Sequence, residues 1–381
     1  MSPSFKFSIL TYMEKQGTLP SQDIRTLIRD GGIVNGNENN VQPASLDLTV
    51  GGKIYRLPHI FLPKPEERVE DVAKEIGAEA YTFEYPLEIN TLYLVKLKEQ
   101  LNLPDSVYGY SNPKSSVGRI DLKVSMLADY VARFDAAGHY GYKGELWAIV
   151  EPKSFRVKIQ PGDTLLQLRL FYSDTRIKNQ NVLENFYRKH NPLYFDETPI
   201  DYKEMKINDE DGSVIMTVDL RYDLVGWRCE GTQKYIDFSK KKLYKPEDFF
   251  APIHKSPQKT VTLRKGDFYI LHTREKIRVP PTYAAEIAPM DVRSGEYRSH
   301  YAGFIDPGFG YGKEGRINGQ SIVLEVRPFE NSIVLSNKQP ICKVVFEELC
   351  EMPDIVYGEE ELGSHYANQT GPRLSKHFVQ E

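Results

Sequence analysis

The sequence predicts a mainly β protein that is built from two similar halves, with a few short helices. Three observations support this prediction: short β-type apolar runs recur, 24 Tyr and 18 Phe favour strands, and one long stretch is repeated. The repeat pairs Pro86–Arg119 with Thr262–Arg293, so that Glu99 corresponds to Glu275. A repeat of this length indicates a duplicated domain rather than a solenoid unit.

The correspondence extends in both directions from this stretch. Residues 44–57 match residues 213–227, and Tyr130–Glu151 match Tyr301–Glu325. A chain of 381 residues has room for two or three domains. We therefore expect a first domain at residues 1–205, which includes an N-terminal helix and a linker. A second domain at residues 206–381 ends in a tail.

The first predicted element is a helix within residues 18–33, with Ser21 as its N-cap and Gly31–Gly32 as its stop. β-type runs then follow at residues 46–50, 92–97, 146–151, 155–159, 164–171 and 341–349. The polar linker at residues 172–211 can hold a second helix near Asn181–Lys189. Many short strands at regular spacing favour a sandwich or a barrel.

Composition excludes several classes of protein. The formal charge of −4 lacks the basic excess of nucleic-acid-binding proteins, so we expect no nucleic-acid polymer as a partner. Cys229, Cys342 and Cys350 have no CxxC spacing and are typical of free thiols in a reducing compartment. The N-terminal stretch carries charges and lacks a long apolar core, so we expect no signal peptide and no membrane association. These features together predict a cytoplasmic protein.

Familiar catalytic motifs are absent from the sequence. It has no HxE with PCxxC, the zinc signature of nucleobase deaminases, and no HExxH. It also has neither a P-loop nor a GxGxxG fingerprint, and no GxSxG elbow supports a serine triad.

One loop, SNPKSSVGR at residues 111–119, could bind a phosphate group. Its hydroxyls and backbone N–H groups can donate to phosphate oxygens, and Arg119 can bind them bidentately. Taken alone this signal is weak, because Ser-Ser-x-Gly also occurs in ordinary loops.

Carboxylates occupy matching places in the two halves. Asp135 and Asp306 each lie in a turn, and Glu151 and Glu325 each follow in an apolar strand. Burial raises the pKa of a glutamate, which suits proton transfer near neutral pH. The alternative for each glutamate is a charge at a strand end that reaches water.

The order of these motifs resembles the dCTP deaminase family of the trimeric dUTPase-like superfamily. The motifs are SSVGR at residues 115–119, AGFIDPGFG at 302–310, SIVLEV at 321–326 and SHYANQTGPRLSK at 364–376. The resemblance spans nearly the whole chain, and it is the four motifs in order that make it specific. It implies two dUTPase-like β-barrel or jelly-roll (β-clip) domains in tandem.

The resemblance also implies a chemistry without zinc. Glu325 would be the general base that activates water against C4 of cytosine, with Ser115 holding the water or the base. Ser116 and Arg119 would bind phosphate, and Asp306 would accept the 3′-hydroxyl of the sugar.

Further residues are assigned to the nucleotide by the same likeness. Phe304 and Ile305 would press against the deoxyribose, and Tyr366 and Gln369 would close over the nucleotide. The tail after Pro353 is accordingly either a lid or a disordered C-terminus. The remaining nucleotide-binding assignments are Lys114, Arg293, Ala302 and Lys376.

Two locations for the active site are open. In a composite site, Ser115, Ser116 and Arg119 of the first half face Asp306 and Glu325 of the second. The second half has PMDVR where the first has SSVGR, so it has lost both serines. In the rival arrangement, the first half holds its own site, with Arg133 and Asp135 in its hairpin and Glu151 as the base.

Three functions compete. The leading interpretation is a dCTP deaminase that forms dUTP and ammonia, with dCTP, dUTP and dTTP as its nucleotides and Mg²⁺ accompanying the triphosphate. The second is a dUTP pyrophosphatase or a bifunctional deaminase that releases dUMP, and the third is a non-catalytic nucleotide-binding protein. The family resemblance further implies a homo-oligomer, for which a homotrimer is the first expectation.

Overall fold

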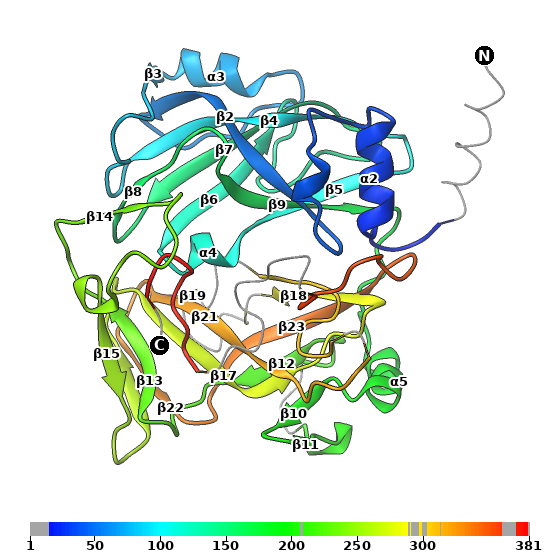
Figure 1. The fold of residues 1–381 in the computed structure, drawn as a ribbon, viewed down its shortest axis with the longest axis vertical. Helices are drawn as coiled ribbons and strands as arrows, with labels where there is room; N and C mark the ends of the chain where they lie inside the picture. Colours follow the sequence, from blue (N-terminus) through cyan, green and yellow to red (C-terminus); the bar gives the residue numbers. More distant parts are fainter. Residues whose placement is uncertain are drawn as a thin grey trace.

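The computed structural model describes residues 15–205, 209–288, 290, 297–298, 303–312, 314–359 and 371–379. Within them the chain is mainly β, as the sequence predicts (Figure 1). The helices are α2 (Ser21–Arg29), α3 (Val69–Glu75), α4 (Ser115–Gly118) and α5 (Gln180–His190). Among these residues no helix is both long enough and apolar enough to cross a membrane.

The N-terminal half forms an eight-stranded sheet. Its order is β5-β9-β2-β4-β7-β6, with β1 added beside β4 and β3 beside β2. The strands are β1 (Ile33–Val34), β2 (Leu46–Leu57), β3 (Glu79–Ala80), β4 (Leu92–Asn102), β5 (Tyr108–Pro113), β6 (Leu122–Ala128), β7 (Lys143–Pro152) and β9 (Thr164–Phe171). The predicted runs at residues 46–50, 92–97, 146–151 and 164–171 lie in β2, β4, β7 and β9 of this sheet, and most of their side chains are buried.

The C-terminal half contains three sheets. A seven-stranded sheet has β10 (Leu193–Phe195), β11 (Thr198–Pro199), β13 (Leu224–Cys229), β15 (Phe250–His254), β17 (Tyr269–Ile277), β19 (Tyr297–Arg298) and β21 (Gln320–Pro328). A four-stranded sheet has the order β12 (Val214–Thr217), β23 (Pro340–Glu348), β18 (Tyr283–Ala288) and β20 (Phe304–Ile305). The third sheet pairs β16 (Thr260–Leu263) with β22 (Ile333–Ser336).

A further strand pair connects the halves. β14 (Tyr235–Asp237) runs parallel to β8 (Arg156–Lys158), so a segment of the C-terminal half extends onto the N-terminal half. Phe249, Phe250 and Phe378 of the C-terminal half join the apolar core of the N-terminal half. The second core lies within the C-terminal half. The domain boundary near residue 205 stays a prediction.

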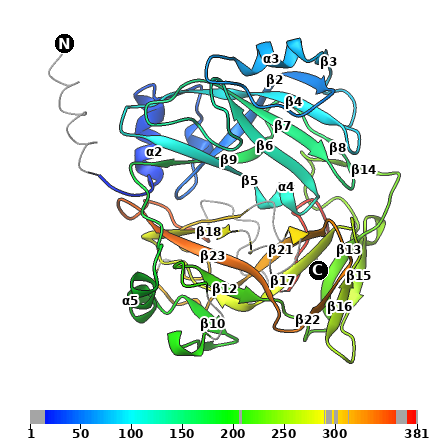
Figure 2. The same cartoon turned by 180° about the vertical axis from the view of Figure 1, so that it is seen from behind.

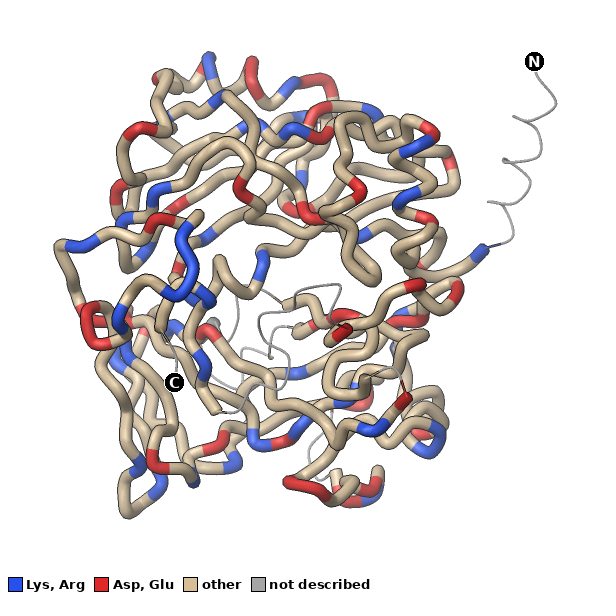
Figure 3. The backbone as a smooth tube through the Cα atoms, viewed as in Figure 1, with Lys and Arg blue, Asp and Glu red and all other residues tan. Residues whose placement is uncertain are grey.

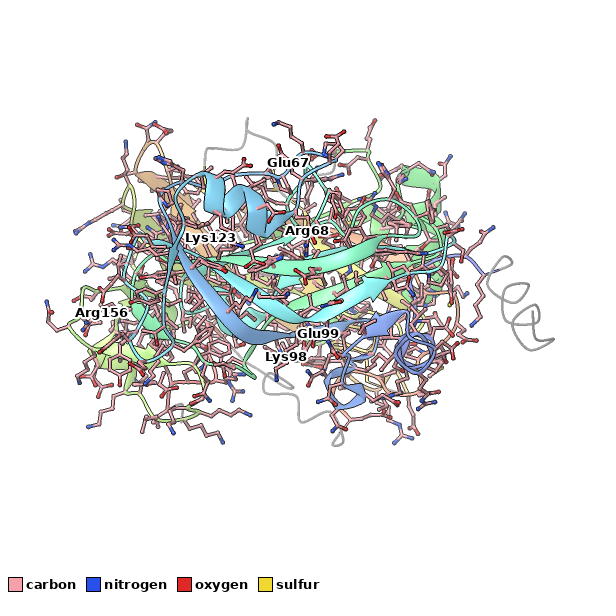
Figure 4. The ribbon with its side chains drawn as sticks, turned by 90° about the horizontal axis from the view of Figure 1, so that it is seen from above. Glu67, Arg68, Lys98, Glu99, Lys123 and Arg156 are labelled. Atoms are coloured by element: carbon pink, nitrogen blue, oxygen red, sulfur yellow. The ribbon has the colours of Figure 1, made fainter. Side chains whose placement is uncertain are left out.

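Two glutamates at corresponding places make the same contact in both halves. Glu99 accepts a hydrogen bond from the backbone N–H of Thr49 (2.8 Å), and Glu275 accepts one from the N–H of Thr217 (2.7 Å). In each case the strand register shifts beside the threonine, where a bulge disturbs the backbone pairing. Figure 4 looks down on the N-terminal sheet and labels Glu99 where β2 and β4 run side by side.

The first helix departs from prediction in one detail. Ser21 is the first helical residue and Pro20 occupies the cap position, so the assignment of Ser21 as N-cap is wrong. The carbonyl of Pro20 instead accepts hydrogen bonds from the N–H groups of Asp23 and Ile24. The predicted helix at Asn181–Lys189 is confirmed as α5, with Asn179 capping it through Val182 N–H.

Candidate active site between the two halves

The phosphate-loop motif forms α4, a single helical turn between β5 and β6. Lys114 N–H donates to the carbonyl of Leu165 (3.0 Å), which fixes the start of the turn. Ser116 and Arg119 are buried, and Ser116 Oγ has no hydrogen-bond partner among the described residues. A buried hydroxyl of this kind is available to a ligand.

In both ribbon views α4 lies on the side of the N-terminal half that faces the C-terminal half and β21 (Figures 1 and 2). Glu325 is on β21, opposite Ile270 of β17, and is 1% exposed. A Cβ atom added at Gly118 would lie 2.9 Å from Cδ of Glu325 and 3.0 Å from its Oε1. The carboxylate of Glu325 therefore lies against the backbone of the Ser-Ser-Val-Gly-Arg loop of the other half.

Asp306 directly follows the short hairpin strand β20, which pairs with β18. Its Oδ1 is buried and has no hydrogen-bond partner among the described residues. Burial raises the pKa of Asp306 to about 7, and the negative charge of Asp47 adds to this effect. Asp306 can therefore accept a hydrogen bond from a ligand hydroxyl when it is ionised and donate one when it is protonated.

Two lysines from different halves share the same region. Lys114 forms an ion pair with the buried carboxylate of Asp47 and donates to Thr164 Oγ1 (3.1 Å). Burial lowers the pKa of Lys376 to about 8, with Lys114 and Lys241 contributing in the same direction. Because cations repel one another here, an anionic ligand between these lysines is favoured.

The C-terminal segment 371–379 forms hydrogen bonds with the Ser-Ser-Val-Gly-Arg loop. Arg119 Nη1 donates to the carbonyl of Arg373 (2.9 Å), and Ser375 Oγ donates to the carbonyl of Ser116 (2.9 Å). Leu374 and Phe378 are buried, so this part of the tail is packed, against the expectation of a disordered C-terminus. Tyr366 and Gln369 lie outside the described residues, as do Arg293 and Ala302.

The corresponding residues of the N-terminal half are occupied by their own neighbours. Asp135 accepts hydrogen bonds from Met126 N–H (2.7 Å) and Ser111 Oγ (3.2 Å). Glu151 pairs with Lys153 (2.9 Å) and Lys123 (3.7 Å).

The arginine of the same hairpin faces outward. Arg133 is exposed, with its guanidinium 5.5 Å from the ring centre of Tyr110. The geometry thus brings together the residues of the composite arrangement and leaves those of the rival arrangement in local contacts.

Sequence reasoning missed Asp47, which lies beside Lys114 and acts on the pKa of Asp306. Asp47 is a carboxylate inside an apolar strand, the same signal that singled out Glu151 and Glu325. Its depth in the sheet and its lysine partner depend on the pairing of β2 with β9, which no local pattern gives.

The variant Asp306→Asn gives a pH-dependent test of this site. The folded pKa of about 7 lies above the unfolded value near 3.8, so the folded state holds its proton through this window. Stability contributed by this carboxyl is therefore lost as pH rises from about 4 to 7. We expect the variant to unfold about 2 °C or more above wild type at pH 8 and at nearly the same Tm at pH 4. Thermal melts at both pH values measure this, and a Tm difference independent of pH would contradict it.

A buried carboxylate facing a hydroxyl-rich, basic loop fits the class of hydrolytic enzymes that act on phosphorylated substrates. The chain matches the family model for the 2′-deoxycytidine 5′-triphosphate deaminase N-terminal domain over residues 15–174. It matches the model for the C-terminal domain of the same family over residues 189–378. The chain belongs to the dCTP deaminase family, whose members hydrolyse a C–N bond.

Individual relatives agree with this assignment. A dUMP-forming dCTP deaminase of Methanosphaera stadtmanae is 30% identical over 148 residues, which are 38% of this chain and 70% of the relative. The same activity is named for a Bifidobacterium animalis protein that is 31% identical over 124 residues, or 32% of this chain and 60% of the relative. The crystal structure of the 2′-deoxycytidine 5′-triphosphate deaminase from Agrobacterium tumefaciens superposes with a TM-score of 0.81 at 31% identity. The match covers 91% of this chain and 99% of the Agrobacterium tumefaciens chain.

Proposed function

We propose that the chain deaminates dCTP hydrolytically at the composite site between its halves. The observation that supports this most is the contact of the Glu325 carboxylate with Gly118 of the loop from the other half. A general base and a phosphate-binding loop must lie within one nucleotide length of each other, and these two do. Both come from the same chain.

In the proposed reaction, Glu325 takes a proton from water as the oxygen attacks C4 of cytosine. Ser115, at the start of α4, holds the water or the base in place. The glutamate then returns the proton toward N3 or the departing amine, so that one water and one dCTP give dUTP and ammonia. Ser116 and Arg119 bind phosphate oxygens, and Lys114 and Lys376 add positive charge.

The second half supplies the sugar contacts. Asp306 accepts the 3′-hydroxyl through the Oδ1 atom that lacks a protein partner among the described residues. Phe304 and Ile305, which precede it in β20, lie against the deoxyribose.

Mg²⁺ would accompany the triphosphate. The described residues contain no group of three or more His, Cys, Asp or Glu side chains that could hold a metal ion by themselves. The ion would neutralise phosphate charge, and proton transfer at C4 would be left to Glu325 without zinc.

A second candidate is a bifunctional enzyme that releases dUMP, because the relatives named above are called dUMP-forming. That reaction adds hydrolysis at the α-phosphate and needs a carboxylate near it. Asp47, beside Lys114, is one candidate. We further propose a homotrimeric, cytoplasmic enzyme that also binds dUTP and dTTP.

The experiment that tests this function is incubation with dCTP and Mg²⁺, followed by ion-exchange separation of products and an ammonia assay. dUTP and ammonia without pyrophosphate support the deaminase. dUMP with pyrophosphate supports the bifunctional enzyme. Unchanged dCTP contradicts both proposals.

A further inference from the structure

Arg169 is a buried arginine that connects the two halves. It lies on β9 of the N-terminal half, is 2% exposed, and forms an ion pair with Glu347 of β23. Its Nη1 is 3.1 Å from Oε2 of Glu286, which lies on β18. The same Nη1 donates to Oδ1 of Asn112 (3.2 Å), two residues before Lys114 of the phosphate loop.

The guanidinium also packs on the hairpin that carries Asp306. Its carbon lies 4.6 Å from the ring centre of Phe304 in β20, a distance typical of a cation–π contact. Phe304 is buried in a small apolar cluster with Ala44, Ala284 and Leu349. One side chain thus touches the strand leading into the phosphate loop and the aromatic residue proposed to face the sugar.

The strand of the C-terminal half that corresponds to β9 has no arginine at the position of Arg169. β2 pairs Asp47 with Gln167, and β12 pairs Ile215 with Lys343 at the corresponding place, so Arg169 corresponds to Val345. The apolar side chain of Val345 cannot make the same ion pairs. The equivalent strand of the C-terminal half therefore cannot form the ion pairs that Arg169 of β9 makes.

The rigid, planar guanidinium of Arg169 allows it to contact groups on several strands at once. Its planar fork binds two carboxylates in set directions, and its face stays available for an aromatic ring. Arg169 and Glu347 are both buried, so neither can exchange its partner for water at low cost, whereas Glu286 and Asn112 are partly exposed.

We propose that Arg169 is a positioning residue that determines sugar specificity. By holding Phe304 against the N-terminal half, it fixes the surface on which the sugar lies and leaves no room for a 2′-hydroxyl. This inference rests on the proposed function, because it assumes that the nucleotide lies between α4 and β20. Arg169 itself need not touch the nucleotide.

The test compares dCTP with CTP in wild type, Arg169→Lys and a neutral triple variant, Arg169→Met with Glu286→Gln and Glu347→Gln. The triple variant removes the arginine without leaving the carboxylates of Glu286 and Glu347 unpaired. The ratio of kcat/KM for dCTP to that for CTP does not depend on the folded fraction, so a merely structural role leaves it unchanged. We expect this ratio to fall about tenfold in the triple variant and less in Arg169→Lys.

The matched control is Arg221→Met with Asp219→Asn, which neutralises another arginine–carboxylate pair (2.7 Å) in the C-terminal half. The control should keep the wild-type ratio. If the triple variant does not fold, Arg169→Lys and the single variant Glu286→Gln carry the same comparison. A ratio within about twofold of wild type in the folded triple variant, or in Arg169→Lys where the triple variant does not fold, would overturn the proposal.

A second readout separates this inference from the proposed function. Calorimetric Kd values for dCTP and CTP give the same preference without turnover. If wild type binds dCTP over CTP but releases no ammonia, the proposed function fails and the Arg169 variants still test the preference. Equal Kd values for both nucleotides in wild type would overturn the inference.

Discussion

Glu325→Gln is expected to reduce ammonia release from dCTP by about 10²–10⁴-fold, the range typical of losing a general acid–base group. Gln has nearly the same shape as Glu but cannot take the proton from water. KM for dCTP should change little, because the loop, the hairpin and the lysines that bind phosphate and sugar are untouched. Steady-state ammonia release and a thermal melt on the same preparation measure the effect.

The matched control for this prediction is Glu151→Gln in the corresponding strand of the N-terminal half. Glu151 pairs with Lys123 and Lys153 at 3.7 and 2.9 Å. Its replacement should alter kcat by less than about twofold, since a partly exposed pair of this kind contributes little even to stability. A large loss in Glu151→Gln with normal activity in Glu325→Gln would move the base to the N-terminal half.

Gly118→Ala is expected to reduce kcat by about 10²-fold while the protein stays folded. The new methyl group would lie 2.9 Å from Cδ of Glu325 and 3.0 Å from Oε1, which is too close for either atom to remain in place. Because the carboxylate is the far end of a flexible side chain, it can move aside at small cost to stability. The base then leaves its position relative to the phosphate loop. Kinetics and thermal melts on the variant measure both parts of the prediction.

Gly52→Ala provides the control for adding a methyl group to a glycine. A Cβ atom at Gly52 in β2 would meet no atom within 4 Å. This variant should keep wild-type kcat and KM. If Gly118→Ala is equally active, Glu325 is not working against the loop, and the composite site is wrong.

Much of the fold could be predicted from the sequence because its determinants are local. β9 shows this in residues 164–171, an apolar run in which only Thr164 and Gln167 are partly exposed and the other residues are buried. Helix α5 was predictable from an amphipathic stretch that Asn179 caps. The cap of α2 was not, because Pro20 at that position supplies a backbone carbonyl rather than the side-chain oxygen that sequence rules look for.

The candidate site was predictable only in its parts. The hydroxyls of α4, the hairpin Asp306 and the strand Glu325 each carry a local signal. Their proximity carries no local signal, because Gly118 and Glu325 are brought together by the packing of the two halves. The pairing of Lys114 with Asp47 and the position of Arg169 likewise depend on strand neighbours far apart in the chain. Acidic and basic positions are interspersed over both halves, so net charge alone does not mark the site (Figure 3).

The most direct test of a deaminase site shared between the two halves is a crystal structure of the Glu325→Gln chain with dCTP and Mg²⁺. We expect the cytosine C4 beside residue 325 and the sugar 3′-hydroxyl on Asp306, with phosphate oxygens bound by Ser116 and Arg119 of the same chain. A nucleotide bound instead between Asp135 and Glu151 of the N-terminal half would contradict the composite site.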